Sequence, residues 1–189
     1  MDTPTKKQIR TWGKQILASD RGAFDRLFRS MYPRLVRFAR RYHSRKAIAD
    51  DIVQDVFVSL WEKREYIDPN QSLKAYLYTM VRNKSLNHIR DYSDEKVGLE
   101  DERLLKTTDP SHPDGDNGQL KKHMNEWIKD LPDRQREAFE LSRFEGLDHD
   151  EIAGVMDVSS STVNNHIVAA LSTLRDRYEE YKQNKTDEL

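Results

Sequence analysis

The sequence predicts an all-α protein with two small helical domains joined by a flexible linker. Apolar residues recur at helical spacing along most of the 189 residues, and alternating apolar and polar runs typical of strands are absent. Only seven glycines occur and 34% of the residues are charged, which suits helices with wet surfaces. Between residues 93 and 118 the apolar periodicity stops and Pro, Gly, Asp and Ser become frequent. We therefore expect a first domain at 1–94, an acidic linker at 95–118 and a second domain at 119–189.

The composition limits the class of protein. No cysteine is present, which excludes a disulfide framework and a thiolate metal site. No apolar run approaches the roughly 20 residues of a membrane span, and the first residues lack the apolar core of an export signal. We expect a cytoplasmic protein with no membrane insertion.

A net charge of −1 conceals an asymmetry along the chain. Residues 1–94 hold 19 Lys and Arg against 11 Asp and Glu, whereas residues 119–189 hold 10 against 15. The basic first part indicates a polyanion partner. The last part, at net −5, lacks the electrostatic attraction that usually drives isolated DNA binding.

The first domain is predicted to begin with an amphipathic helix over 6–17 and a longer helical stripe over 21–42. Pro33 predicts a new helical segment or a kink within that stripe. Arginines occupy the opposite face: Arg26, Arg29, Arg34, Arg37, Arg40, Arg41 and Arg45. A charge run is usually a solvated face, but seven arginines with few acids nearby favour contact with phosphate or an acidic protein surface.

Residues 47–63 predict a helix with a buried apolar stripe and a polar edge. Asp50 and Asp51 are expected in its first turn, where negative charge suits the helix dipole. A catalytic or metal cluster of these carboxylates is a weaker alternative, because no histidine or further acid completes a coordination shell. The edge predicts a surface for docking another protein, bordered by aromatic rings: Gln54, Asp55, Phe57 and Trp61.

A loop over 66–71 precedes a helix for which Ser72 is a good N-cap. Its predicted core stripe is Leu73, Tyr76, Leu77, Met80 and Val81. The remaining surface mixes basic, polar and aromatic residues: Lys74, Tyr78, Arg82, Lys84, Asn87, His88 and Arg90. This pattern is typical of proteins that bind melted nucleic acid, and an ordinary core with a basic solvent face explains it equally well.

The second domain ends in a predicted helix-turn-helix. Two helices over 119–131 and 133–146 lead to it, the later one with Ala138, Phe139, Leu141 and Phe144 facing inward. A short helix opens near Asp148 and breaks at Asp157, and another starts near Ser160 and continues toward the frayed last seven residues. A polar run opens that last helix and favours DNA reading over a plain helical hairpin: Ser159, Ser160, Ser161 and Thr162.

Two stretches carry a family resemblance. AFDRLFRSMYPRLVRFARR, followed by ADDIVQDVFVSLWEK, resembles the first conserved domain of bacterial RNA polymerase sigma factors. LPDRQREAFELSRFEGLDHDEIAGVMDVSSSTVNNHIVAALSTLR resembles their last domain. The short linker with no intervening domain is similar to the extracytoplasmic-function (ECF) group of the sigma-70 family. The resemblance covers about residues 20–178.

The resemblance implies a non-enzymatic specificity subunit that needs no cofactor or metal ion. It implies that the protein binds core RNA polymerase at the largest-subunit clamp and flap regions, directs it to promoter DNA and promotes transcription initiation. It also implies an anti-sigma factor as a further partner. At the polymerase interface it places Asp51, Gln54, Asp55, Phe57 and Trp61.

The resemblance further implies two DNA contacts and a path for the linker. Contact with the promoter −10 element would involve Tyr66, Asn70, Arg82, Asn83, Asn87 and Arg90. Contact with the −35 element would involve Ser160, Ser161, Thr162, Asn164, Asn165 and His166. The linker would thread through the RNA path of the polymerase. Two departures stand out: Asp157 replaces the glycine common in the turn, and Asn164, Asn165 and His166 stand where many relatives carry basic residues.

Two other functions fit parts of the sequence. The run STVNNHI also resembles the output helix-turn-helix of response regulators, and a stand-alone regulator of that type would leave residues 1–94 unexplained. A helical hydrolase or metal enzyme would use Asp50, Asp51, Asp55 and a histidine. The six histidines include no pair at metal-ligand spacing.

Overall fold

The computed structural model describes residues 4–93 and 116–187. These residues form eight α-helices and one 3-10 turn, with no strand among them, which confirms the all-α prediction. The chain divides into two compact units, Met1–Leu105 and Lys106–Leu189. All but the last three residues of the predicted linker lie outside the described residues.

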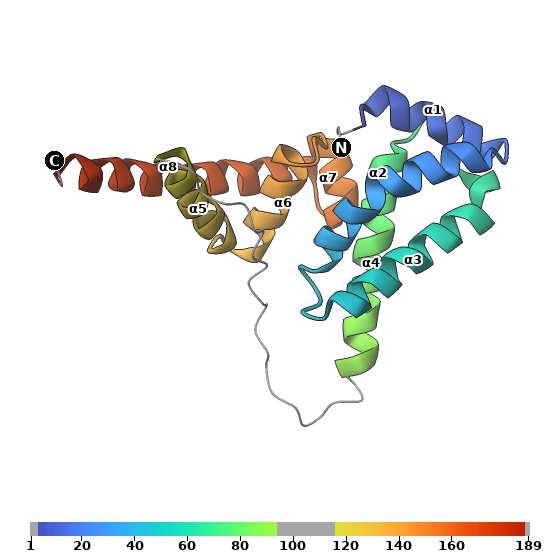
Figure 1. Cartoon of the computed structure of the whole chain (residues 1–189), viewed down its shortest axis with the longest axis horizontal. Helices are drawn as coiled ribbons and strands as arrows, with labels where there is room; N and C mark the ends of the chain where they lie inside the picture. Colours follow the sequence, from blue (N-terminus) through green and yellow to red (C-terminus); the bar gives the residue numbers. More distant parts are fainter. Residues whose placement is uncertain (1–3, 94–115, 188–189) are drawn as a thin grey trace. The chain divides into compact units, whose positions relative to one another are not determined.

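The first unit is a helical bundle in which α2 packs against each of the other three helices (Figure 1). Its elements are α1 (Lys6–Leu17), α2 (Arg21–Ala39), α3 (Lys46–Glu62), the 3-10 turn η1 (Arg64–Tyr66) and α4 (Leu73–Ser93). The bundle closes over fully buried aliphatic side chains, each worth about 1.5–3 kcal/mol. Among them are Ile16, Leu27, Leu35, Val53, Leu60 and Leu77.

Helix α1 is an integral part of this bundle. Thr5 and Gln8 form a capping box that satisfies two backbone N–H groups at its start. Ile9 and Ile16 are buried. Gly13 faces α4, where a Cβ atom would lie 3.2 Å from Leu73 Cδ2. The missing side chain therefore allows the two helices to pack closely.

Helix α2 runs through Pro33 without ending, so the predicted new helical segment does not form. A proline inside a helix costs about 3 kcal/mol. Pro33 is exposed, whereas Leu27, Met31 and Leu35 form a fully buried row on either side of it. Burial of that row offsets the cost and keeps the helix continuous.

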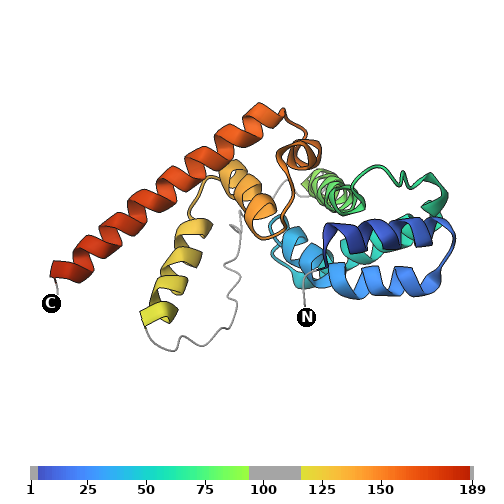
Figure 2. The ribbon, with the colours of Figure 1, turned by 90° about the horizontal axis from the view of Figure 1, so that it is seen from above.

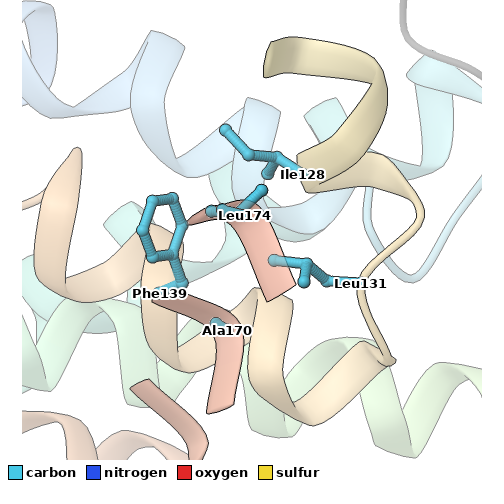
Figure 3. Packing of buried hydrophobic residues seen from close by; sticks show 5 residues of the cluster. All are labelled: Ile128, Leu131, Phe139, Ala170 and Leu174. Atoms are coloured by element: carbon cyan, nitrogen blue, oxygen red, sulfur yellow. The ribbon is translucent and has the colours of Figure 1, made fainter. Parts of the chain in front are cut away.

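In the second unit one long helix contacts the other three, and Figure 2 shows it unbroken along its length. The elements are α5 (Asp116–Lys129), α6 (Asp133–Arg143), α7 (His149–Met156) and α8 (Ser160–Asp187). Their shared core, drawn in Figure 3, combines side chains of α5, α6 and α8 with Leu131, which lies between α5 and α6. It consists of Ile128, Leu131, Phe139, Ala170 and Leu174.

Both ends of this unit extend beyond the prediction. Helix α5 starts at Asp116 rather than near Gln119, and α8 continues to Asp187, so the predicted fraying of the last seven residues is wrong for most of them. Helices α5 and α8 meet through aromatic side chains. The Tyr181 ring lies 5.1 Å from His123 and 6.0 Å from Trp127.

The inward or outward assignments of Tyr76, Tyr78 and Phe144 are wrong. Tyr78 is fully buried against Phe38, with ring centroids 5.0 Å apart, whereas Tyr76 is 45% exposed. Phe144, expected inside, is 49% exposed, while Ala138 and Leu141 are buried as predicted. Tyr76 and Tyr78 lie on opposite sides of α4, and only packing against α2 decides which side is the core.

Candidate protein and nucleic-acid interfaces

The exposed side of α3 carries a row of acidic and polar residues. Asp51, Gln54 and Asp55 are exposed there at helical spacing, and Val58 and Glu62 continue the same face. Helix α3 starts at Lys46 and has no acidic residue in its first turn, so the predicted helix-dipole role of the aspartates is wrong. The exposure of these side chains makes the surface accessible to a partner. We call Asp51, Gln54, Asp55, Val58 and Glu62 the acidic row.

An aromatic cluster lies beneath the acidic row. Phe57 is only 2% exposed, so its predicted place on the surface is wrong. Its ring lies 4.8 Å from Phe28 and 6.0 Å from Phe24, and Trp61 lies 5.1 Å from Phe24. Trp61 is partly buried, with the Arg64 guanidinium 4.7 Å from its ring. The cluster holds α3 on α2 and supports the row from below.

Sequence reasoning missed Val58, which is the exposed apolar residue of the acidic row at 56% exposure. Its signal was available, because position 58 follows 51, 54 and 55 on the same helical face. An apolar residue between charges gives a docking surface a contact that excludes water.

Two neighbouring helices reach the acidic row. Tyr32 Oη of α2 donates to Asp50 Oδ1 at 3.1 Å and accepts from Gln54 Nε2 at 3.5 Å. Burial raises the pKa of the Tyr32 phenol; the Gln54 hydrogen bond opposes this, and the hydrogen bond and charge of Asp50 add to it. From α4, Lys84 Nζ lies 3.2 Å from Asp55 Oδ2. Sequence analysis missed both contacts, because the residues that meet are far apart along the chain.

The loop before α4 presents two of the predicted DNA-contacting residues. Tyr66 is 79% exposed and Asn70 is exposed. The Asn70 N–H donates to Asp68 Oδ1 at 2.8 Å, and Arg10 Nε of α1 donates to the Pro69 carbonyl at 3.3 Å. The loop is thus held in shape while the Tyr66 ring remains open to solvent.

The other residues predicted to contact the −10 element lie on α4, and they differ in exposure. Asn83, Asn87 and Arg90 are exposed, so the structure places them together on the outer surface of this helix. Arg82 and Lys74 are each only 6% exposed, and their predicted surface position is wrong. Lys74 and Arg82 lie four residues before and after Tyr78, so they share its face of α4. Because this face packs into the bundle, both cationic side chains are buried.

His43 is a buried histidine beside this helix. Burial, reinforced by the charge of His88, lowers its pKa to about 4. The two rings lie 4.9 Å apart, and His88 in turn stacks on Tyr92 at 4.4 Å. Within 4–93 and 116–187, no cluster of three or more potential ligand side chains could hold a metal ion.

The helix-turn-helix forms as predicted in the second unit. Asp148 caps α7 and forms a capping box with Glu151. Asp157 ends α7 in the left-handed conformation, at φ 57° and ψ 55°. A left-handed aspartate is tolerated at some cost, so it can replace the usual glycine. Gly146 takes φ 63° and completes the bend before α7.

The polar run at the start of α8 is partly used within the protein. Ser159 caps α8, accepting from the Thr162 N–H at 3.2 Å. Ser160 donates to Asp150 of α7. Asn164 and Asn165 are exposed, and His166 is partly exposed. The amides are therefore the most available groups for reading base edges, while the hydroxyls brace the motif.

Two family models match the chain, one in each unit. The model described as Sigma-70 region 2 matches residues 27–95, and the model described as Sigma-70, region 4 matches residues 126–174. The first match spans most of α2 and all of α3 and α4. The second includes the helix-turn-helix.

Curated relatives align over most of their length. The ECF RNA polymerase sigma factor RpoE of Cereibacter sphaeroides is 28% identical over 158 residues, which is 82% of this chain and 86% of the relative. The ferric citrate uptake sigma factor FecI of Escherichia coli is 29% identical over 125 residues, covering 65% and 72%.

Two solved structures share the fold. The sigma factor RpoE from Bartonella quintana, in complex with the anti-sigma factor NepR, matches with a TM-score of 0.62 at 23% identity, covering 82% of this chain and 96% of that one. CnrH, in complex with the cytosolic domain of CnrY, matches with a TM-score of 0.61 at 23% identity, covering 92% and 98%.

The fold and its surfaces define a two-domain helical transcription factor with a C-terminal helix-turn-helix. The two family matches and the curated relatives then show that the chain belongs to the sigma-70 family, in its ECF group. It is a factor that directs RNA polymerase to promoters. The stand-alone regulator is disfavoured, because the region 2 match accounts for most of the residues that this alternative left unexplained. Sigma factors are non-enzymatic initiation factors.

None of the helices within the described ranges has the length and apolar character needed to cross a bilayer.

Proposed function

We propose that the acidic row of α3 docks on the clamp of the polymerase largest subunit. The observation that carries this proposal is the exposure of Asp51, Gln54 and Asp55 in one row above a packed aromatic cluster. Carboxylates on a rigid helix suit a basic partner surface, and Val58 adds an apolar contact at their centre. Phe57 contributes by holding the helix, and the half-buried Trp61 lies at the border.

We propose that residues 1–94 form the domain that also opens the −10 element. Tyr66 offers an exposed ring on which an unstacked base can lie. Asn70 borders it on the same loop, and Asn83, Asn87 and Arg90 line the outer surface of α4. Arg82 is assigned no DNA contact because it is buried.

For residues 119–189, we propose that α8 enters the major groove of the −35 element. Asn164 and Asn165 are the exposed amides near its start, and asparagine can pair bidentately with adenine. Ser161, Thr162 and His166 would lie near the phosphates or base edges, while Ser160 serves chiefly to brace α7 against α8. Residues 95–118 would span the two domains through the RNA path of the polymerase, and the flap would hold the second domain.

We further propose a protein without catalytic activity that works beside the polymerase in the cytoplasm and is restrained by an anti-sigma factor. Both solved structures are complexes with a partner, and NepR is described as an anti-sigma factor. Their likeness supports a similar restraint here.

The deciding experiment is run-off transcription with core polymerase, with and without this protein. We expect a specific start site only when the protein is present. A matched variant, Asp55→Arg, places a cation in the acidic row and should weaken core binding at least about 100-fold, corresponding to about 3 kcal/mol. The circular dichroism spectrum should remain unchanged, because Asp55 is exposed. Failure to bind core or to direct a start would refute the function, and unchanged binding by Asp55→Arg would remove α3 from the interface.

A further inference from the structure

We propose that Tyr32 and Asp50 are positioning residues that fix the orientation of the Gln54 amide, so that the acidic row presents only hydrogen-bond acceptors to the polymerase. This inference rests on the proposed function, because it takes the acidic row as the docking face. It adds two residues outside the row and states the chemistry that the partner must offer.

The three side chains form a short hydrogen-bonded series from α2 to the exposed side of α3. Tyr32 Oη donates to Asp50 Oδ1 at 3.1 Å, and Gln54 Nε2 donates to Tyr32 Oη at 3.5 Å. The Tyr32 ring lies 4.9 Å from Phe28 and 6.4 Å from Phe57, and Phe57 is buried. The aromatic cluster therefore holds the hydroxyl in place between the two polar side chains.

The direction of each hydrogen bond follows from the donors available. An ionised carboxylate only accepts, and a neutral phenol has one proton, so Tyr32 must donate that proton to Asp50. The phenol oxygen can then only accept from the amide, which must turn its NH₂ group toward Tyr32. A tyrosine phenol is protonated near neutral pH, and burial raises the pKa of Tyr32 further. Gln54 Oε1 consequently faces away from Tyr32, toward the surface.

The acidic row then displays acceptors at three neighbouring positions, namely the carboxylates of Asp51 and Asp55 and the carbonyl of Gln54. Such a surface fits a partner that presents N–H donors, in particular arginine forks and lysine amines. A glutamine without the Tyr32 contact could present either end of its amide. Holding it in one orientation before docking lowers the entropy cost of association.

The test is a set of core-polymerase binding measurements on the full chain. Tyr32→Phe keeps the ring and removes only the hydroxyl. Asp50→Asn keeps the shape but allows an N–H to point at the phenol oxygen, which lets Tyr32 donate to Gln54 and reverses the amide. We expect each change to weaken core binding about three- to tenfold, the effect of losing one oriented hydrogen bond.

The same two changes are repeated in a Gln54→Ala background. With no amide to orient, Tyr32→Phe and Asp50→Asn should leave core affinity unchanged, which a general structural role would not produce. Thermal melts of every variant separate binding from folding. Asp50→Asn leaves the aromatic cluster unchanged. It therefore still tests the positioning role if Tyr32→Phe lowers the melting temperature.

Asp55→Arg serves as the reference for the docking face itself. If Asp55→Arg does not weaken core binding, the proposed function of α3 fails, together with the inference built on it. If Asp55→Arg weakens binding while Tyr32→Phe and Asp50→Asn do not, the docking face stands and the positioning role is overturned. Full additivity with Gln54→Ala would overturn it as well.

Discussion

The outer side of α3 in the first unit and the start of α8 in the second unit face their proposed partners with different chemistry. The acidic row carries formal charge and rests on packed aromatic rings. The start of α8 carries hydroxyls and amides, and its serines are hydrogen-bonded within the helix-turn-helix. One surface can attract a partner from a distance, while the other can only recognise it on contact.

The charge balance of the two parts leads to the same conclusion about attraction from a distance. Residues 1–94 contain 19 cationic against 11 anionic side chains, and residues 119–189 contain 10 against 15. Affinity for DNA depends strongly on cationic contacts with phosphate. The second unit is therefore suited to reading a sequence to which the polymerase and the first unit have already brought it.

The largest effect should come from Phe57→Ala, which removes the ring beneath the acidic row. Truncating a buried phenylalanine costs about 3–5 kcal/mol of unfolding free energy, measurable by urea denaturation. Its neighbour Val58 is the matched control, since Val58→Ala on the exposed face should change stability by no more than about 0.5 kcal/mol and yet weaken core binding. Equal stability losses at both positions would break the distinction between support and contact.

The buried His43 should give the first unit a pH-dependent stability. Its pKa is lowered to about 4 in the folded protein, below the roughly 6.5 of an unfolded histidine. Between these two pKa values the unfolded chain therefore binds more protons than the folded chain. The contribution of His43 to the free energy of unfolding is greatest above about pH 6.5 and falls by about 3 kcal/mol as the pH drops to about 4. An NMR titration of the His43 ring tests this directly, and an apparent pKa near 6.5 would contradict it.

Amide substitutions in α8 test whether the second unit reads DNA by contact alone. Asn164→Ala and Asn165→Ala should each change −35 preference by about 1–3 kcal/mol per lost bidentate contact. Competition binding of the polymerase complex to promoters with altered −35 bases measures this. The salt dependence should change little, because no charge is removed. The same base preference in both variants would move recognition elsewhere.

The smallest effect should follow from Lys84→Ala, which breaks the exposed ion pair between α4 and the acidic row. A pair of this kind, at 3.2 Å with both side chains largely open to water, contributes about 0–1 kcal/mol to stability. Core binding should remain or strengthen slightly, because Asp55 is released for the partner. A loss above tenfold would show that Lys84 itself belongs to the interface.

Local signals in the sequence accounted for the helices and for some of their ends. Ser72 was predicted as a cap and Asp148 as the opening of a helix, and both side chains accept a backbone N–H group of the helix that follows. These features depend on a few consecutive residues, which is why a single sequence suffices to find them.

The exposure of individual site residues was less predictable. Phe57 and Val58 are neighbours separated by about 100° around α3, and both are apolar. Periodicity alone allowed either to face outward, and it placed Arg82 outside although α4 turns it inward. The Tyr32–Asp50–Gln54 series joins two helices and left no trace in the spacing of residues along either one.

The sequence by itself determined the helical class, the division into two parts, the helix-turn-helix and the family, because periodicity, capping residues and motif order are local or linear properties. Tertiary structure alone decided which side of α4 became core, that Phe57 supports the acidic row while Val58 lies within it, and that Tyr32 and Lys84 meet the row from other helices. Those outcomes depend on how helices pack against one another, and a residue's neighbours across a packed interface are not its neighbours along the chain.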